Sequence, residues 1–368
     1  MRIIRTASTP GLVFSLLILC VVGVAQRTGA QVLLPVKING QFGYINTAGR
    51  LVIEPQFDYA GEFAEGLAPV GKKTGSDSRY GYIDEKGVVK IPIQFQEVRP
   101  FSEGRAVVMF QGKYGFIDNS GTFIADAVFD KAFDFSDGLA RVVQRDPDEG
   151  DWLYGFIDRQ GKLIIKPQYV FALDFQEGLA GFAVAGKKTL KMGFINKLNR
   201  VVIKPKFNIV GPFSEGLAVV AQDATTYLFE GSIYIDEGSS PGKKVMYIDK
   251  RGSVVVTGSF ESGASFSEGL ALVEIEKRCR YVDKKGNVVI RPDFRPQATC
   301  GNFSDGLASV NTDNGAKFID KNGKIVIKTD FAWAGDFKSG TARVEVVKGD
   351  GSRTYGYIDR SGRIIWTP

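Results

Sequence analysis

The stretch Gly211–Val220, GPFSEGLAVV, recurs in eight variants along this chain and decides how the rest of the sequence is interpreted. Taken alone, Ser214-Glu215-Gly216 resembles a small catalytic turn. Across the variants, however, Ala64 and Lys338 stand in the place of the serine, and aspartate or serine replaces the glutamate. The glycine alone is constant, which is what a turn with positive φ requires. We therefore expect these turns to be structural. The constant glycines are Gly66, Gly104, Gly138, Gly178, Gly216, Gly269, Gly306 and Gly340.

A second element, an aromatic residue followed by Ile or Val and then Asp or Asn, fixes the period of the repeat. From Ile195 an aromatic residue follows 12 positions later and the constant glycine 21 positions later, and the same spacing holds in seven of eight units. The seventh unit, which starts from Val282, has 24 residues to its glycine. The apolar residues of the element are Ile45, Ile83, Ile117, Ile157, Ile195, Ile248, Val282, Ile319 and Ile358. A period of 34–40 residues is typical of a repeat architecture.

Each unit is expected to contain four short strands, which we call a, b, c and d. They follow the patterns Phe-x-x-Ala-x-x-Phe, Leu-Ala-x-Val, Gly-Tyr-Ile-Asp and Val-Val-Ile-x-Pro, as between Lys113 and Gln144. No helical periodicity lasts ten residues, so helices should be nearly absent. Pro55, Pro167, Pro205 and Pro292 are expected to end strand d. The sequence predicts an all-β fold of tandem four-stranded meanders, β-propeller-like, with an open β-solenoid as the alternative.

The pattern between Tyr80 and Val108, YGYIDEKGVVKIP followed by PFSEGRAVV, resembles the bacterial WG repeat, also called KWG. The resemblance extends from about Val32 to Trp366, although Met246, Arg280 and Lys317 replace the family's glycine in three copies. The resemblance implies a repeat module of secreted or envelope proteins and implies no particular reaction.

The first 30 residues have the pattern of a secretory signal peptide. Arg2 and Arg5 precede an apolar stretch, Leu12–Ala25, that is too short to span a bilayer. Cleavage after Ala25 or Ala30 would leave residues 31–368, or slightly more, as one WG-repeat domain of eight full units and a partial N-terminal one. We expect a secreted or periplasmic protein without a stable membrane span, the alternative being an uncleaved anchor.

Composition argues against several classes of function. The chain contains no His, which removes the commonest general base and metal ligand. The net charge of +6 comes without a Lys/Arg-rich run, so nucleic acid is not an expected partner. We expect no catalytic residues, no cofactor and no metal site. The Asp or Asn that ends each Tyr-Ile-Asp element could bind Ca²⁺, but capping of its own turn is favoured.

The extra length falls in connections that share one end of the predicted blades. These are four b–c loops, Lys72–Arg79, Arg145–Leu153, Ala221–Val245 and Lys348–Thr354, and one d–a loop between Phe294 and Phe303. Loops of variable length on a constant scaffold commonly carry function. The longest contains Tyr227, Phe229 and Tyr234, which are candidate binding residues for a protein or glycan, or else part of an extra self-packed hairpin.

Two cysteines, Cys279 and Cys300, remain once the leader is removed. Cys279 is expected to open strand c of the seventh unit and Cys300 to lie in the following d–a loop. Because both positions share one face, a disulfide is favoured over two buried thiols.

These observations favour a non-catalytic exported scaffold that binds a protein or a cell-envelope glycan through its variable loops. A carbohydrate- or peptidoglycan-active enzyme that uses two carboxylates is one alternative. A purely structural envelope component is the other.

Overall fold

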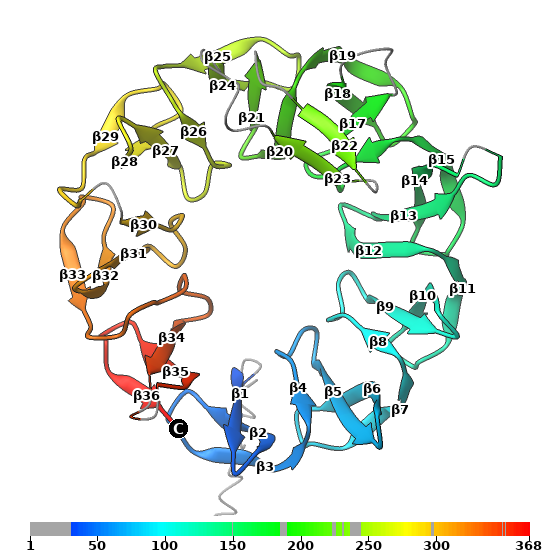
Figure 1. Ribbon diagram of the computed structural model, residues 1–368, viewed down its shortest axis with the longest axis vertical. Coiled ribbons are helices and arrows are strands. Elements are labelled where there is room, and N and C mark those ends of the chain that lie inside the picture. Colours follow the sequence, from blue (N-terminus) through cyan, green and yellow to red (C-terminus); the bar gives the residue numbers. More distant parts are fainter. Residues whose placement is uncertain are drawn as a thin grey trace, which may run out of the picture. The chain divides into compact units, whose positions relative to one another are not determined.

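A computed structural model describes residues 31–368 of the chain except 149, 185–189, 223–225, 230–231, 236–243, 296–297, 348 and 350. The predicted signal peptide lies outside the described residues. Val32–Pro368 forms one unit in which nine antiparallel sheets follow one another around a ring, a β-propeller (Figure 1). The described residues contain no helix, and so none that could cross a membrane.

The nine sheets, or blades, are consecutive along the chain. Blade 1 consists of β1 (Leu33–Ile38), β2 (Gln41–Asn46) and β3 (Leu51–Phe57). Blade 2 consists of β4 (Tyr59–Ala60), β5 (Leu67–Thr74), β6 (Asp77–Asp84) and β7 (Val89–Phe95). Blade 3 consists of β8 (Glu97–Val98), β9 (Arg105–Phe110), β10 (Lys113–Asp118) and β11 (Phe123–Phe129). Blade 4 consists of β12 (Lys131–Ser136), β13 (Leu139–Arg145), β14 (Trp152–Asp158) and β15 (Leu163–Tyr169). Blade 5 consists of β16 (Phe171–Ala172), β17 (Leu179–Val184), β18 (Lys191–Asn196) and β19 (Val201–Phe207).

Blade 6 consists of β20 (Ile209–Ser214), β21 (Leu217–Gln222), β24 (Lys244–Ile248) and β25 (Val254–Thr257). Between β21 and β24 the chain forms a separate hairpin, β22 (Thr226–Phe229) and β23 (Ser232–Ile235). Blade 7 consists of β26 (Ser262–Gly263), β27 (Ala271–Ile275), β28 (Arg278–Val282) and β29 (Val288–Ile290). Blade 8 consists of β30 (Thr299–Cys300), β31 (Ala308–Thr312), β32 (Gly315–Ile319) and β33 (Ile325–Lys328). Blade 9 consists of β34 (Thr341–Val347), β35 (Arg353–Asp359) and β36 (Ile364–Trp366).

Each four-stranded blade is a meander whose first strand lies nearest the centre of the ring (Figure 1). The fold prediction is therefore confirmed, and the ring excludes the open solenoid. The two ends of the ring meet where Tyr357 of blade 9 donates its hydroxyl hydrogen bond to the Pro35 carbonyl of blade 1, at 3.0 Å. Leu34, Val36 and Ile45 of blade 1 pack with Tyr357 in a shared apolar cluster.

The core lies between the blades rather than inside them. Between blades 2 and 3, for example, Tyr82 and Phe95 pack against Phe101 and Val108. The described residues form nine buried apolar clusters, and each joins one pair of adjacent blades, including blades 9 and 1. A single blade is too thin to bury both of its own faces, so each depends on its neighbours.

Strand d differs from its sequence-based prediction. Pro55, Pro167 and Pro205 do not end the strand: they lie inside β3, β15 and β19, at a break in the register with strand c. An outermost strand tolerates proline because its free edge needs no N–H donor. The aromatic residue expected at the start of strand a, such as Phe57, instead ends strand d. Pro292 does lie beyond the end of its strand, β29.

The glycine that names the WG pattern explains how far strand d runs. A Cβ on Gly155 would lie 2.5 Å from the Ile165 carbonyl oxygen and 2.7 Å from the Pro167 nitrogen, so the bulged strand d passes directly against this glycine. Where the pattern has Met246, Arg280 or Lys317 instead, strand d has only four, three and four residues, against seven in β15. In blades 1 to 5, where strand d has seven residues, the missing side chain therefore makes room for the longer strand.

We predict that Gly155→Ala destabilises the protein by about 1–3 kcal/mol, because the added methyl group overlaps backbone atoms that must move. Urea unfolding followed by tryptophan fluorescence measures the loss. Gly349→Ala is the matched control, because nothing lies within 4 Å of its added Cβ. Equal stability of the two variants would contradict this explanation of the glycine.

Candidate functional site

The Ser-Glu-Gly turns join neighbouring blades. Ser214 donates to the Phe266 carbonyl at 2.7 Å, and the Glu215 carboxylate accepts the N–H of Gly269 at 3.0 Å. Both partners belong to blade 7. Six other turns make the same carboxylate contact with the next blade, from Glu65, Glu103, Asp137, Glu177, Glu268 and Asp305 to Gly104, Gly138, Gly178, Gly216, Gly306 and Gly340. These turns are an interblade clasp, in agreement with the structural interpretation of the sequence.

The backbone of the clasp directs its carboxylate. Glu215 has a φ of 53° and Gly216 a φ of 89°, so both central residues are left-handed, whereas the sequence indicated this only for the glycine. A glutamate in this region is strained. The strain is offset by the contacts that the side chain makes with the next blade, where Lys284 adds an ion pair at 3.1 Å. Burial raises the pKa of Glu215, but the hydrogen bonds from Lys284 and Gly269 outweigh burial and leave the pKa below its ordinary value.

The Asp and Asn residues that follow the Tyr-Ile element cap their own turns. Asp84 Oδ1 accepts the backbone N–H groups of Lys86 and Val88, both at 3.0 Å. The same pair of bonds is made by Asn46, Asp118, Asp158, Asn196, Asp249, Asp283, Asp320 and Asp359. The described residues contain no cluster of three metal-ligating side chains. One oxygen of each side chain is thus committed to the turn.

The a–b and c–d turns therefore form a constant face, and the b–c and d–a connections form the opposite, variable face. One predicted b–c loop is wrong: most of Lys72–Arg79 continues strands β5 and β6, which meet at the turn Gly75-Ser76. In blade 4 the loop is real and lies between Arg145 and Trp152. Lys348 of the last loop lies outside the described residues.

The longest loop carries the hairpin of β22 and β23, in which Tyr227 pairs with Tyr234 and Phe229 with Ser232. This backbone register agrees with the hairpin alternative from the sequence. It does not decide whether Tyr227, Phe229 and Tyr234 bind a ligand, and their binding role stays a prediction.

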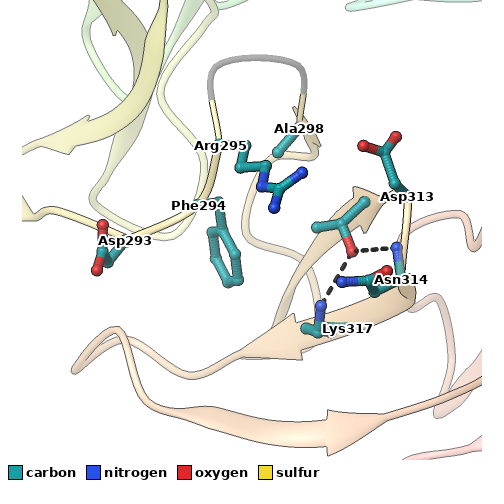
Figure 2. A pocket seen from close by; sticks show the side chains of 8 residues that line it. Asp293, Phe294, Arg295, Ala298, Asp313, Asn314 and Lys317 are labelled. Atoms are coloured by element: carbon teal, nitrogen blue, oxygen red, sulfur yellow. Dashed lines mark hydrogen bonds between the residues drawn. The ribbon is translucent and has the colours of Figure 1, made fainter.

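A cavity of about 180 Å³ opens on the variable face between the blade 7–8 connection and the b–c turn of blade 8 (Figure 2). Phe294, Arg295 and Ala298 come from the connection, and Asn314 and Lys317 come from the turn. Lys317 Nζ lies 2.9 Å from Thr312 Oγ1 and 5.8 Å from the centre of the Phe294 ring. An aromatic ring beside cationic and amide donors suits a small polar or anionic group.

Two carboxylates, those of Asp293 and Asp313, also line this cavity, and a pair of carboxylates is what the enzyme alternative requires. Figure 2 shows them on opposite sides, with Phe294 and Arg295 between them. A second pair of carboxylates, Asp134 and Asp174, is held by guanidinium groups: Arg99 lies 3.5 Å from Asp134, and Arg141 lies 2.9 Å from Asp174.

Burial raises the pKa of Asp134, and Asp174 raises it further against the opposing effect of Arg99. These four residues connect blades 3, 4 and 5. They vary between repeats and belong to no motif, so no sequence pattern singles them out.

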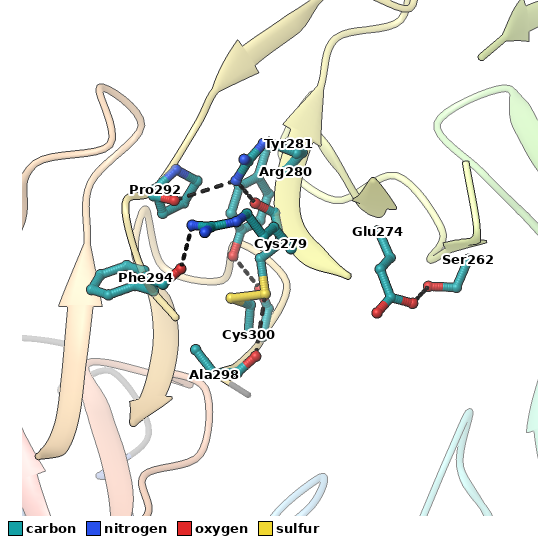
Figure 3. The surroundings of a disulfide bond; sticks show 11 residues. Ser262, Glu274, Cys279, Arg280, Tyr281, Pro292, Phe294, Ala298 and Cys300 are labelled. Carbon is teal, nitrogen blue, oxygen red and sulfur yellow. Dashed lines mark hydrogen bonds between the residues drawn. A yellow bond between two sulfur atoms is a disulfide. The ribbon is translucent and has the colours of Figure 1, made fainter. Parts of the chain in front are cut away.

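A disulfide joins Cys279 to Cys300, with their Cα atoms 6.3 Å apart (Figure 3). Cys279 lies in strand c of blade 7, as expected. Cys300 is not in the d–a loop: it lies in β30, the inner strand of blade 8, opposite Val310. The three extra residues of this unit precede β30, so they shift the position at which the strand begins. The disulfide therefore links two adjacent blades beside the cavity of Figure 2.

The geometry defines a class first: a nine-bladed β-propeller with one constant and one variable face. The crystal structure of a eukaryotic initiation factor is similar, with 12% identity, a TM-score of 0.55 and coverage of 92% of this chain and 96% of that chain. At this identity the likeness concerns the fold alone. Apo AztD from Citrobacter koseri aligns with 10% identity, a TM-score of 0.39 and coverage of 81% and 93%. No curated protein matches the sequence.

The chain belongs to the WG containing repeat family, which matches residues 42–73, 80–114, 114–146, 154–187, 192–224, 246–279, 280–315 and 318–346. A matched repeat begins on strand c and ends near the junction of strands b and c of the next blade, as from Tyr80 to Tyr114. Each sequence repeat thus spans two blades, which is why eight matches accompany nine blades.

We predict that Glu215→Ala lowers the unfolding free energy by about 1–2 kcal/mol near neutral pH, because the partly buried Gly269 N–H loses its charged acceptor. Glu54→Ala, on the exposed side of β3, is the matched control. Because the pKa of Glu215 is lowered in the folded protein, its contribution is present above the ordinary glutamate pKa of about 4.3 and is lost as pH falls through the lower folded value. If the difference in unfolding free energy between Glu215→Ala and Glu54→Ala persists below the folded-state pKa of Glu215, this role of the carboxylate is contradicted.

Thiol titration of the denatured, unreduced protein should find no free thiol on Cys279 or Cys300, and two after reduction. Cys20 of an uncleaved leader would add one, so the N-terminus is determined by mass spectrometry on the same sample. Reduction should lower stability by about 3 kcal/mol, the chain-entropy contribution of a loop this size. Two free thiols before reduction would exclude the bond.

Proposed function

We propose that this protein is a non-catalytic scaffold, exported to the periplasm or secreted, that binds a protein or a cell-envelope glycan through its variable face. The observation that carries the proposal is the contrast between the two faces. The constant face is fixed by repeated clasps and capped turns, whereas the long hairpin and the cavity beside the disulfide lie on the opposite face. Loops on a rigid scaffold are a common location for binding residues.

The chemistry of the variable face supports binding of a polar partner. Arg295, Lys317 and Asn314 offer hydrogen-bond donors around Phe294. Disulfide bonding beside this cavity supports export, because disulfides persist in oxidising compartments. The signal-peptide pattern of the first 30 residues supports the same location. The ion pair of Asp174 with Arg141, at 2.9 Å, favours a structural role for that carboxylate over acid catalysis.

The long loop can be removed with a replacement that the chain itself provides. Blade 3 joins its b and c strands with Gln111-Gly112. In blade 6, β21 ends and β24 begins at the positions equivalent to the end of β9 and the start of β10. Replacing residues 223–243 with Gln-Gly therefore keeps the blade and deletes the loop. Phe294→Ala/Arg295→Ala tests the cavity, and Arg251→Ala on the constant face is the matched control.

Capture from envelope extracts, together with a glycan array, should identify a ligand that the loop or cavity variants lose and Arg251→Ala retains. Affinity at least tenfold weaker is expected, equivalent to about 1.4 kcal/mol. A ligand that binds all variants equally would contradict the assignment to the variable face. Hydrolysis of a glycan on the array would favour the enzyme alternative instead.

A further inference from the structure

In the described part of the chain, blade 1 has no counterpart of the inner strand of the other blades. Its sheet contains only β1, β2 and β3, which correspond to strands b, c and d. Blade 9 also has three named strands, but a bridge between Ala334 and Val344 occupies the place of its inner strand. Among the described residues, no strand pairs with the inner edge of β1, which faces the centre of the ring between β34 and β4 (Figure 1).

The register shows which groups this edge presents. Leu33 pairs with Asn46 in blade 1 as Leu67 pairs with Asp84 in blade 2, so Pro35 and Lys37 correspond to Pro69 and Gly71. In blade 2 the Pro69 and Gly71 carbonyls accept hydrogen bonds from Gly61 and Asp58, at 2.8 and 3.0 Å. The carbonyls of Pro35 and Lys37 are therefore directed at the place of the missing strand.

One of these two acceptors has a substitute partner. The hydroxyl of Tyr357 donates to the Pro35 carbonyl at 3.0 Å, whereas the corresponding hydroxyl of Tyr44 donates to Gly61 in the inner strand of the next blade. Burial raises the pKa of Tyr357 to about 12, so the hydroxyl remains a donor at neutral pH. Tyr357 thus closes the ring at a position where strand pairing is otherwise absent.

A cavity of about 510 Å³ occupies this place. The exposed rings of Tyr59 and Tyr355 line it, together with Phe42 and Trp366. An ion pair between Lys338 and Glu62, at 3.1 Å, connects the a–b turn of blade 9 to blade 2 across the gap. Its lining includes Pro35, Val36 and Lys37, so the cavity runs along the edge of β1.

The charges around the cavity are predominantly positive. Arg353 pairs with Glu345 at 3.1 Å, and Glu62 pairs with Lys338. The guanidinium of Arg343 stacks 3.6 Å from the centre of the Tyr355 ring, and Lys37 Nζ lies 5.4 Å from that of Phe42. Within the part of the chain that the structure describes, Lys37 and Arg343 form no ion pair. They therefore offer two cations to an anionic ligand.

We propose that this gap binds a short, extended acidic segment of a partner protein, which adds to the inner edge of β1 as the missing strand. Its backbone N–H groups bond to the Lys37 carbonyl and to the second lone pair of the Pro35 carbonyl, whose first accepts the Tyr357 hydroxyl, and its carboxylates face Lys37 and Arg343. A peptide is favoured over an acidic glycan because the edge presents backbone acceptors at strand spacing. The bound segment needs two to six residues in strand conformation, because the inner strands β4 and β12 have two and six residues.

The inference rests on the proposed binding role and deepens it by naming a class of partner at a site away from the hairpin of blade 6. The two are separable because shortening the blade 6 loop should leave this site intact. The probe is a fluorescein-labelled octapeptide of alternating Glu and Val, with a Lys/Val octapeptide of the same length as control. Fluorescence anisotropy measures binding, and hydrogen exchange reports the protection of residues 33–38.

The Glu/Val peptide should bind and slow exchange in residues 33–38, and the Lys/Val peptide should do neither. Lys37→Gln/Arg343→Gln should weaken binding at least tenfold, while Lys90→Gln, a change of charge on the outer strand β7, and the loop-shortened variant should bind as the wild type. N-methylation of the Glu/Val backbone should abolish binding to the unmodified protein, independently of any variant.

Four results would overturn the proposal. The first is equal binding by the double variant and the wild type, and the second is unchanged binding of the N-methylated peptide. The third is equally tight binding of polygalacturonate without protection of residues 33–38, which would indicate a glycan site. The fourth is slow exchange of the Lys37 amide, which lies on the same edge as the Lys37 carbonyl, before any probe is added; this would show that the chain itself covers this edge.

Discussion

The packing of each blade against its two neighbours is the interaction on which the rest of this structure depends. Phe95 of blade 2 and Phe101 of blade 3 are buried only because the two blades meet, and every other junction repeats this arrangement. The clasp turns add polar contacts along one face, where Glu215 of blade 6 satisfies Gly269 of blade 7. A repeat that cannot bury its own surface gains stability from each added neighbour. Closing the ring removes the two ends at which that surface would remain exposed.

The staggered relation between sequence repeat and blade accounts for the features of the closure. A repeat that starts on strand c and ends after strand b supplies strands to two blades, and the first matched repeat starts on strand c of blade 1. Before it, the described residues supply only β1, so within them blade 1 has no inner strand. Tyr357 and the Ile45 cluster join blades 9 and 1 without it. The irregular blade pair 7–8 is instead joined by the Cys279–Cys300 disulfide. Variation is thus concentrated where the ring closes and in the loops of one face.

Much of the fold could be predicted from the sequence because the repeat exposes it eight times. The constant 21-residue spacing gave the number of units, and the replacement of Ser214 and Glu215 in other units indicated that their turn is structural. The course of strand d was not predictable from proline alone: Pro167 lies within β15 because Gly155 lets the strand bulge past it. The place of Cys300 is not predictable from spacing alone, because the three extra residues could lie before or around it, and in the structure they precede β30.

The candidate sites were less predictable, since they depend on residues that the repeat does not constrain. Arg343 and Lys37 are more than 300 positions apart and meet only because the ring closes. Their signal in the sequence was indirect. The partial first unit indicated that a strand a was absent from it, but only the structure shows that the place of this strand lies between blades 9 and 2. Arg295 and Lys317 likewise come from different blades and share no motif.

Closure of the ring is the central claim, and small-angle X-ray scattering of the purified protein at low concentration tests it most directly. A flat ring predicts a pair-distance distribution with one broad maximum and a short tail, together with a scattering profile that the ring coordinates reproduce. An early maximum at the width of one blade, followed by a long linear decline, would indicate an extended stack of blades and would contradict the account.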